Sequence, residues 1–132
     1  MVAMRNCWHG MPESRALIVI PARLESTRLP RKLLLAETGK PLIEYAYDAA
    51  CQAVNFPAFN HSPLVVCDCL ELAEACKVFL GDSGDVVVSC REHTNGTSRA
   101  AEAFDEFFAD HVDGGDDWIV VVLQADEPEI EP

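Results

Sequence analysis

Short runs of apolar residues alternate with longer amphipathic segments along most of the chain. Four of these runs are apolar throughout or but for one terminal serine and are too short for a typical helix, a pattern typical of strands buried on both faces of a sheet. They cover residues 16–21, 64–67, 86–89 and 118–123. We therefore predict four strands at these positions.

Three segments between the predicted strands carry apolar residues at helical spacing. They cover residues 41–53, the stretch between Asp68 and Gly81, and residues 97–111. Asp68 with Glu71 three positions later has the form of a helix N-terminal cap, so we expect the Asp68 side chain to cap the second helix. The third helix is expected to turn its aromatic residues largely inward, namely Phe104, Phe107 and Phe108.

Strands that alternate with helices predict an α/β fold, with a mainly parallel sheet, flanking helices and right-handed crossovers. In such sheets ligands gather beyond the carboxyl ends of the strands. The loops that leave the four predicted strands begin at Ala22, Asp68, Cys90 and Gln124, and we expect them to converge on one crevice. The first loop extends to Lys40, which is longer than a structural connection needs.

Length and charge exclude several classes of protein. The chain has 132 residues, 49% of them hydrophobic, as expected for one compact domain rather than a disordered chain. Its net charge of −12 argues against binding nucleic acid over a broad face. No apolar run approaches the ~20 residues of a membrane span. Residues 1–14 lack the apolar segment of a secretory signal, so the cytoplasm is the expected location, with six reduced, mostly structural cysteines.

The charges are unevenly distributed. Residues 15–40 contain six basic and two acidic residues, whereas residues 101–132 contain eleven acidic and no basic ones. Cations in the first loop and carboxylates after the last strand suit a magnesium-bound phosphate ester in the predicted crevice. Neither a Walker-type Gly-x-x-x-x-Gly-Lys-Ser/Thr motif nor a Gly-x-Gly-x-x-Gly motif is present, so the common nucleotide and dinucleotide cradles are excluded.

Three motifs follow predicted strands in order: Ile20-Pro-Ala-Arg-x-x-Ser-Thr-Arg-Leu-Pro-x-Lys32, His93-x-x-Gly-Thr-x-Arg99 and Gln124-x-Asp-Glu-Pro128. Together they resemble the 3-deoxy-manno-octulosonate (KDO) cytidylyltransferase family, also called CMP-KDO synthetases. The resemblance runs from about residue 16 to the last residue and covers the front half of the family's usual chain. It implies a Rossmann-like nucleotidyltransferase domain of the nucleotide-diphospho-sugar transferase type. In that family the anomeric hydroxyl of KDO attacks the α-phosphate of CTP with Mg²⁺, which releases pyrophosphate and gives CMP-KDO for lipopolysaccharide.

The resemblance also implies roles for individual residues. Lys32 and Arg28 are the expected catalytic residues, with Lys32 stabilising charge at the reacting phosphate. Gln124 is expected near the sugar acid, and Asp126 is expected to bind Mg²⁺. The expected nucleotide-binding residues are Ala22, Arg23, Ser26, Arg28, Lys32, His93, Gly96, Thr97 and Arg99.

The chain departs from the family pattern at three positions. It has Arg31 and Ala125 where the family usually has Gly, and Asn95 where the family has Ser. Glycine before a functional acid often marks a positive φ or a close backbone approach. If this position needs either, the methyl group of Ala125 is expected to displace Asp126.

We expect residues 1–14 to be an N-terminal extension and residues 15–132 to be the nucleotide-binding part of a cytidylyltransferase domain, truncated at its C-terminal end. The family's second half supplies the KDO pocket, another metal-binding aspartate and the contacts of a homodimer. This chain is therefore expected to keep a nucleotide crevice and to have little transferase activity alone. Two alternatives remain: a cytidylyltransferase for another sugar acid, and a non-catalytic nucleotide-binding or interaction module.

Overall fold

The computed structural model describes residues 15–55, 59, 61–81, 85–89, 91–108 and 118–126. Its strands are β1 (Arg15–Ala22), β2 (Leu64–Cys67), β3 (Asp85–Val88) and β4 (Trp118–Val122). Its α-helices are α1 (Leu42–Ala53), α2 (Leu70–Leu80) and α3 (Gly96–Phe108), and a 3-10 turn, η1 (Lys32–Leu34), lies in the long loop after β1. All four strands and all three helices are thus confirmed, η1 was not predicted, and residues 109–111 lie outside the described residues.

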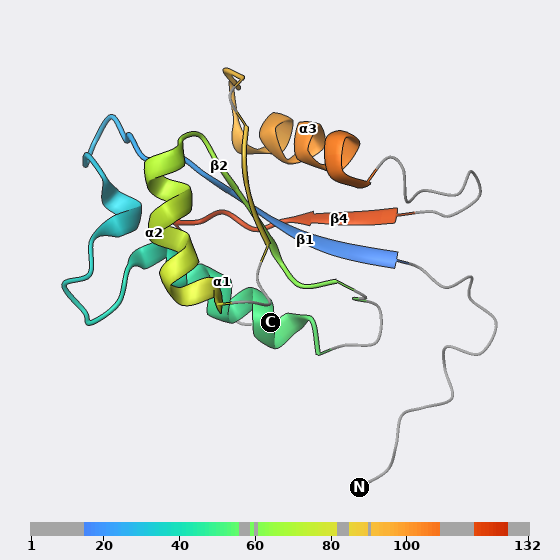
Figure 1. The fold of residues 1–132 in the computed structure, drawn as a ribbon, viewed down its shortest axis with the longest axis horizontal. Coiled ribbons are helices and arrows are strands. Elements are labelled where there is room, and N and C mark those ends of the chain that lie inside the picture. Colours follow the sequence, from blue (N-terminus) through green and yellow to red (C-terminus); the bar gives the residue numbers. More distant parts are fainter. Residues whose placement is uncertain are drawn as a thin grey trace, which may run out of the picture.

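The strands form one parallel sheet in the order β3-β2-β1-β4. Val19 of β1 pairs with Leu64 of β2 on one side and with Val122 of β4 on the other. The central strand β1 is almost completely buried, which explains why its sequence is continuously apolar. The predicted α/β fold with a mainly parallel sheet is confirmed (Figure 1).

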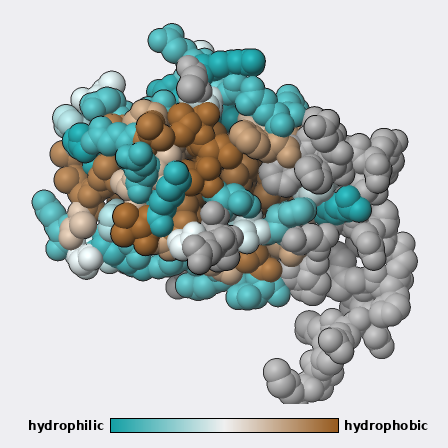
Figure 2. All heavy atoms as spheres, viewed as in Figure 1, coloured by the Kyte–Doolittle hydropathy of each residue, from teal (hydrophilic) through white to brown (hydrophobic). Residues whose placement is uncertain are grey.

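Helices cover both faces of the sheet. The α1 and α2 helices pack on the face that carries Ile18, Ile20 and Val65, whereas α3 packs on the opposite face over Leu17 and Val19. Figure 1 shows α3 on one side of the strands and α1 with α2 on the other. Figure 2 shows hydrophobic residues across the middle of this view, between α2 and α3, with polar residues around them.

The edge strand β4 is covered on one face. Trp118 packs against Phe104 of α3, with 5.7 Å between the ring centroids. On the opposite face Ile119 and Val121 are 53% and 40% exposed. The prediction of an inward aromatic cluster on α3 is wrong for Phe107, which is 46% exposed although it follows the buried Ala100 and Ala103 at helical spacing.

Pro21 lies inside the central strand without breaking it. Val19 accepts a hydrogen bond from Leu123 on the β4 side. Pro21 is two residues further along β1, so its backbone N also faces β4, but the β4 pairing already ends at Val122. The missing N–H of Pro21 therefore costs no sheet hydrogen bond, and the strand can continue to Ala22.

Asp68 does not cap α2 as predicted. The N-terminal cap of α2 is Cys69, without a side-chain cap, and Asp68 Oδ1 instead accepts a hydrogen bond from the backbone N–H of Leu24 at 3.0 Å. Leu24 is buried, so its N–H would otherwise lack a partner. The hydrogen bond to this distant N–H therefore replaces the cap that the local pattern predicts.

None of the described helices is long and apolar enough to cross a membrane.

Candidate functional site

A cavity of about 300 Å³ opens at the carboxyl ends of the strands. Its walls come from the loops that follow β1, β3 and β4 and from the start of α3. The predicted convergence is thereby confirmed for three of the four loops, while Asp68 is not among the described lining residues and binds the backbone N–H of Leu24. The lining residues are Pro21, Arg23, Glu25, Ser26, Thr27, Lys32, Leu33, Asn95, Gly96, Arg99, Gln124, Ala125 and Asp126.

The floor of the cavity is fixed by the last residue of β1. The carbonyl of Ala22 accepts hydrogen bonds from the backbone N–H of Asp68 at 3.2 Å and from Arg99 Nη1 at 3.1 Å. Together with the bond from Leu24 to Asp68, these contacts hold the start of the basic loop against β2 and α3. The start of the loop is therefore held in place, and two cations of the loop, Arg23 and Lys32, line the cavity.

The N-terminus of α3 forms one wall. Asn95 Oδ1 accepts a hydrogen bond from Ser98 N–H at 2.8 Å, so Asn95 caps the helix. Gly96 packs so closely on Pro21 that a Cβ there would lie 2.9 Å from Pro21 Cγ. The first N–H groups of a helix and its dipole favour a negative charge, so this wall suits an anion.

Lys32 and Asp126 meet within the cavity. Lys32 Nζ lies 2.6 Å from Asp126 Oδ2, although the two residues are 94 positions apart in the chain. The hydrogen bond from Lys32 is the main cause that lowers the pKa of Asp126 below its ordinary value. Both side chains remain partly exposed, so the pair is open to a ligand that can exchange partners with it.

Arg99 supplies a buried positive charge. The residue is 3% exposed and lines the cavity, and its Nε has no hydrogen-bond partner among the described residues. Burial lowers the pKa of its guanidinium, which still carries its charge at neutral pH. A buried donor without a partner is costly, so a ligand oxygen at this position would relieve the cost.

The predicted site residues fall into two groups. Those that line the cavity are Arg23, Ser26, Lys32, Gly96, Arg99, Gln124 and Asp126. Ala22, Arg28, His93 and Thr97 are not among the described lining residues, and their binding roles stay predictions. Asn95 lies in a loop that was expected at the crevice, but its role as the cap of α3 was missed, although an asparagine directly before a helical glycine is a signal for a cap.

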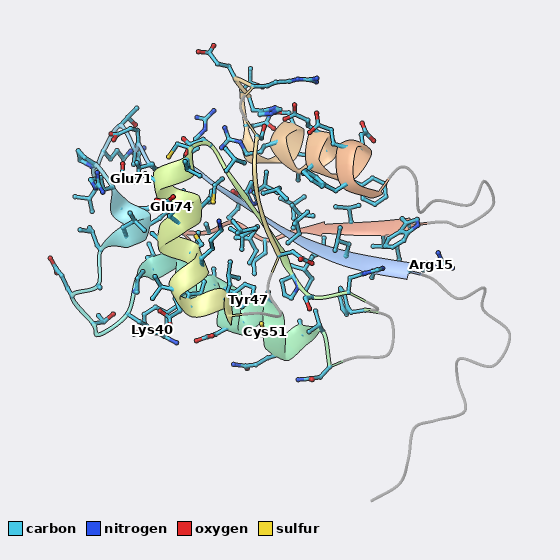
Figure 3. All side chains as sticks on the ribbon, viewed as in Figure 1. Arg15, Lys40, Tyr47, Cys51, Glu71 and Glu74 are labelled. Atoms are coloured by element: carbon cyan, nitrogen blue, oxygen red, sulfur yellow. The ribbon has the colours of Figure 1, made fainter. Side chains whose placement is uncertain are left out.

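Two departures from the family pattern have visible structural effects. Arg31 has φ 56°, the one positive φ among the described non-glycine residues, and its guanidinium pairs with Glu71 of α2. Figure 3 shows Glu71 on the side of α2 that faces the loop of η1. Ala125 has no positive φ, and its methyl group packs into the buried core. Ala125 therefore lacks the positive φ that was expected to displace Asp126.

The residues around the cavity suit a metal ion that is held mainly by a bound substrate and water. Within the described part of the chain, no group of three or more His, Cys, Asp or Glu residues could hold a metal ion. Asp126 and Glu25 line the cavity, and carboxylate oxygens are the ligands that Mg²⁺ prefers. A single carboxylate fits Mg²⁺ if substrate phosphates and water supply the other ligands.

Comparison with known proteins identifies the family. A family model described as cytidylyltransferase matches residues 17–132. The chain is 39% identical over 115 residues to 3-deoxy-manno-octulosonate cytidylyltransferase 2 of Actinobacillus pleuropneumoniae, covering 87% of this chain and 40% of that protein. It is 35% identical over 119 residues to the corresponding Escherichia coli enzyme, covering 90% and 42%. The chain thus spans about two fifths of the length of these curated relatives.

Solved structures agree with this result. The structure of a CMP:2-keto-3-deoxy-manno-octonic acid synthetase complexed with CTP matches with a TM-score of 0.72 and 35% identity, covering 90% of this chain and 43% of that one. Rv0371c of Mycobacterium tuberculosis matches with a TM-score of 0.59 at 21% identity, a likeness of fold alone, covering 92% and 57%. The chain belongs to the cytidylyltransferase family and is homologous to the N-terminal portion of CMP-KDO synthetases.

Proposed function

We propose that the cavity binds CTP and that residues 15–132 form the nucleotide-binding part of an enzyme that transfers CMP from CTP to KDO with release of pyrophosphate. The observation that carries the proposal is the meeting of Arg23, Lys32 and Arg99 with Asp126 around one cavity, in a chain of this family. Three cations offset much of the charge of a triphosphate, which no neutral pocket can do.

Each residue has a distinct part in the proposal. Lys32 exchanges its contact with Asp126 for a phosphate oxygen, and the flexible lysine stem allows this movement. Asp126 is then free to bind Mg²⁺, which neutralises phosphate charge when bound. Arg99 donates its unpaired Nε–H to the ligand from a fixed, buried position. The chain thus contributes placement and electrostatic stabilisation, which nucleotidyl transfer chiefly requires.

Calorimetric titration with CTP, UTP and ATP in the presence of Mg²⁺ tests the binding step. We expect CTP to bind more tightly than ATP and the Lys32→Met variant to bind at least about tenfold more weakly, as expected when a charged hydrogen bond is lost. Lys77→Met is the matched control, since Lys77 is an exposed residue in the last turn of α2. Absence of CTP binding by the unaltered chain would refute the proposal.

A non-catalytic nucleotide-binding module is the second candidate, because the proposed metal ligand Asp126 is paired with Lys32 in this structure. Pyrophosphate release from CTP plus KDO distinguishes the two. Release comparable to that of a full-length relative supports catalysis by this chain. CTP binding without release supports the module. A sugar-acid specificity other than KDO would appear as release with another acid alone.

A further inference from the structure

A buried cluster of polar side chains ties the loop after β3 to the body of α3. Ser89 is 7% exposed, and the side chains of His93 and Glu102 are 9% and 10% exposed. His93 Nε2 lies 2.9 Å from Ser89 Oγ and 2.5 Å from Glu102 Oε2, and the Ser89 hydroxyl also donates to Glu102 Oε2. None of the three is among the described residues that line the cavity.

The arrangement is not a nucleophilic triad. In a triad the serine and the carboxylate contact opposite nitrogens of the imidazole, so that the carboxylate orients the ring while the other nitrogen takes the serine proton. Here Ser89 and Glu102 both reach Nε2. One proton on Nε2 satisfies both contacts, and Glu102 acts purely as an acceptor. The geometry therefore serves to hold the loop, not to activate the serine.

Glu102 is the hub of this cluster. Besides Ser89 and His93, its second oxygen pairs with Arg91 Nε at 3.0 Å. These donors, the Ser89 hydroxyl first, hold the pKa of Glu102 below its ordinary value. Three donors from residues 89–93 thus converge on one ionised carboxylate of α3, and charge-assisted bonds of this kind are the strong ones.

The loop held by Glu102 reaches a cavity cation through its backbone. The carbonyl of His93 accepts a hydrogen bond from Arg23 Nη2, and Arg23 lines the cavity. Arg23 is itself exposed, so this carbonyl is what restricts its long side chain. Two residues further on, Asn95 caps α3 and also lines the cavity. A chain of contacts therefore runs from Glu102 through His93 to Arg23.

We propose that Glu102 is a positioning residue that fixes Arg23 over the cavity through the carbonyl of His93. The inference rests on the proposed function in one respect, since Arg23 is taken to meet the triphosphate. Glutamine cannot satisfy all three donors, because its amide nitrogen must face either Arg91 or the Ser89 and His93 donors, and it carries no charge. In Glu102→Gln the loop and Arg23 would therefore lose their fixed positions, although the side chain at position 102 keeps its length and nearly its volume.

The first arm of the test needs no nucleotide. In NMR spectra of the ligand-free chain, the guanidinium signals of Arg23, assigned by their loss in Arg23→Gln, should be separate from those of mobile arginines. Glu102→Gln should merge them with the mobile signals. Glu106→Gln, the same change one turn further along α3 at a half-exposed residue, should leave them in place. Unchanged Arg23 signals in folded Glu102→Gln overturn the inference.

The second arm measures CTP affinity in a double-mutant cycle. Glu102→Gln alone should weaken CTP binding about tenfold, and Arg23→Gln should do the same. Glu102→Gln added to Arg23→Gln should change affinity less than about twofold, because Glu102 acts through Arg23. If the two losses of CTP affinity multiply in the double variant, Glu102→Gln causes a general structural defect and the inference is overturned.

Two further results have defined meanings. If circular dichroism shows that Glu102→Gln is unfolded, Ser89→Ala takes its place, with a loss of about threefold and the same dependence on Arg23. If the unaltered chain fails to bind CTP while the Arg23 signals still follow Glu102, the proposed function fails and the positioning role stands.

Discussion

Gly96→Ala is the substitution that probes the cavity wall most sharply. The new Cβ would lie 2.9 Å from Pro21 Cγ and 3.3 Å from Gln124 Oε1. Carbon atoms normally pack at about 3.5–4.0 Å, so α3 must move away from the sheet by roughly 0.5–1 Å. Gln124 is exposed and can rotate aside, but the ring of Pro21 is fixed in the central strand.

Two opposing terms set the size of the effect. Overpacking of this kind costs about 1–3 kcal/mol, whereas replacing a helical glycine by alanine returns up to about 1 kcal/mol. Gly96 has no positive φ, so no backbone strain is added. We therefore expect the free energy of unfolding, measured by urea titration, to fall by about 1–2 kcal/mol. The displaced wall should also weaken CTP binding at least about fivefold, measured by calorimetry, because a small displacement of ligand-binding groups is costly.

Gly81→Ala is the matched control. Gly81 ends α2 with φ 63° and ψ −159° and has open space for a Cβ, so alanine there costs about 1–3 kcal/mol through backbone strain alone. Gly81 is not among the described cavity residues, and its substitution should leave CTP affinity unchanged. Gly96→Ala with unaltered stability and unaltered affinity would refute the reasoning that close packing at Pro21 sets the wall.

Three further predictions follow from single contacts. Lys32→Met should raise the pKa of Asp126 toward its ordinary value of 3.8, as read from carboxyl carbon shifts in an NMR titration, and an unmoved pKa would contradict the pairing. The pair stabilises the fold above pH 3.8, and this contribution is lost as pH falls through the lowered pKa of Asp126. Arg31→Gly should raise the free energy of unfolding by about 1 kcal/mol because glycine accepts φ 56° without strain, whereas Arg31→Ala should not; equal effects would exclude backbone strain as the cause. Arg99→Met should lower the free energy of unfolding by about 1–2 kcal/mol, since the lost hydrogen bond to the Ala22 carbonyl outweighs the relief of the unpaired Nε, and it should weaken CTP binding at least about tenfold; unchanged binding would remove Arg99 from the site.

The sequence predicted the elements well because their patterns are local. The run at 16–21 is continuously apolar, and β1 is buried on both faces as that pattern requires. The convergence of the loops also followed from general rules, since parallel strands end at one edge of the sheet. Lys32 and Asp126 could therefore be expected near each other, although no local pattern gives their 2.6 Å contact.

What the sequence could not predict depends on contacts between distant segments. Asp68 has the local pattern of a cap, yet the buried N–H of Leu24, brought close only by folding, takes its side chain. The partners of the His93 ring, Ser89 and Glu102, could not be predicted either, because folding brings Glu102 of α3 to this loop, and the expected nucleotide contact of His93 stays a prediction. The left-handed conformation of Arg31 is also invisible in the sequence alone, because arginine gives no signal for a positive φ.

The central claim is that the triphosphate of CTP lies among Arg23, Lys32 and Arg99. An NMR titration of the chain with CTP and Mg²⁺ tests it directly, because backbone shifts report where a ligand binds. The account predicts saturable shifts at the residues that line the cavity, including Asn95, Gly96 and Asp126, and none around Gly81 at the far end of α2. Shifts confined to other surfaces, or no shifts at all, would contradict it.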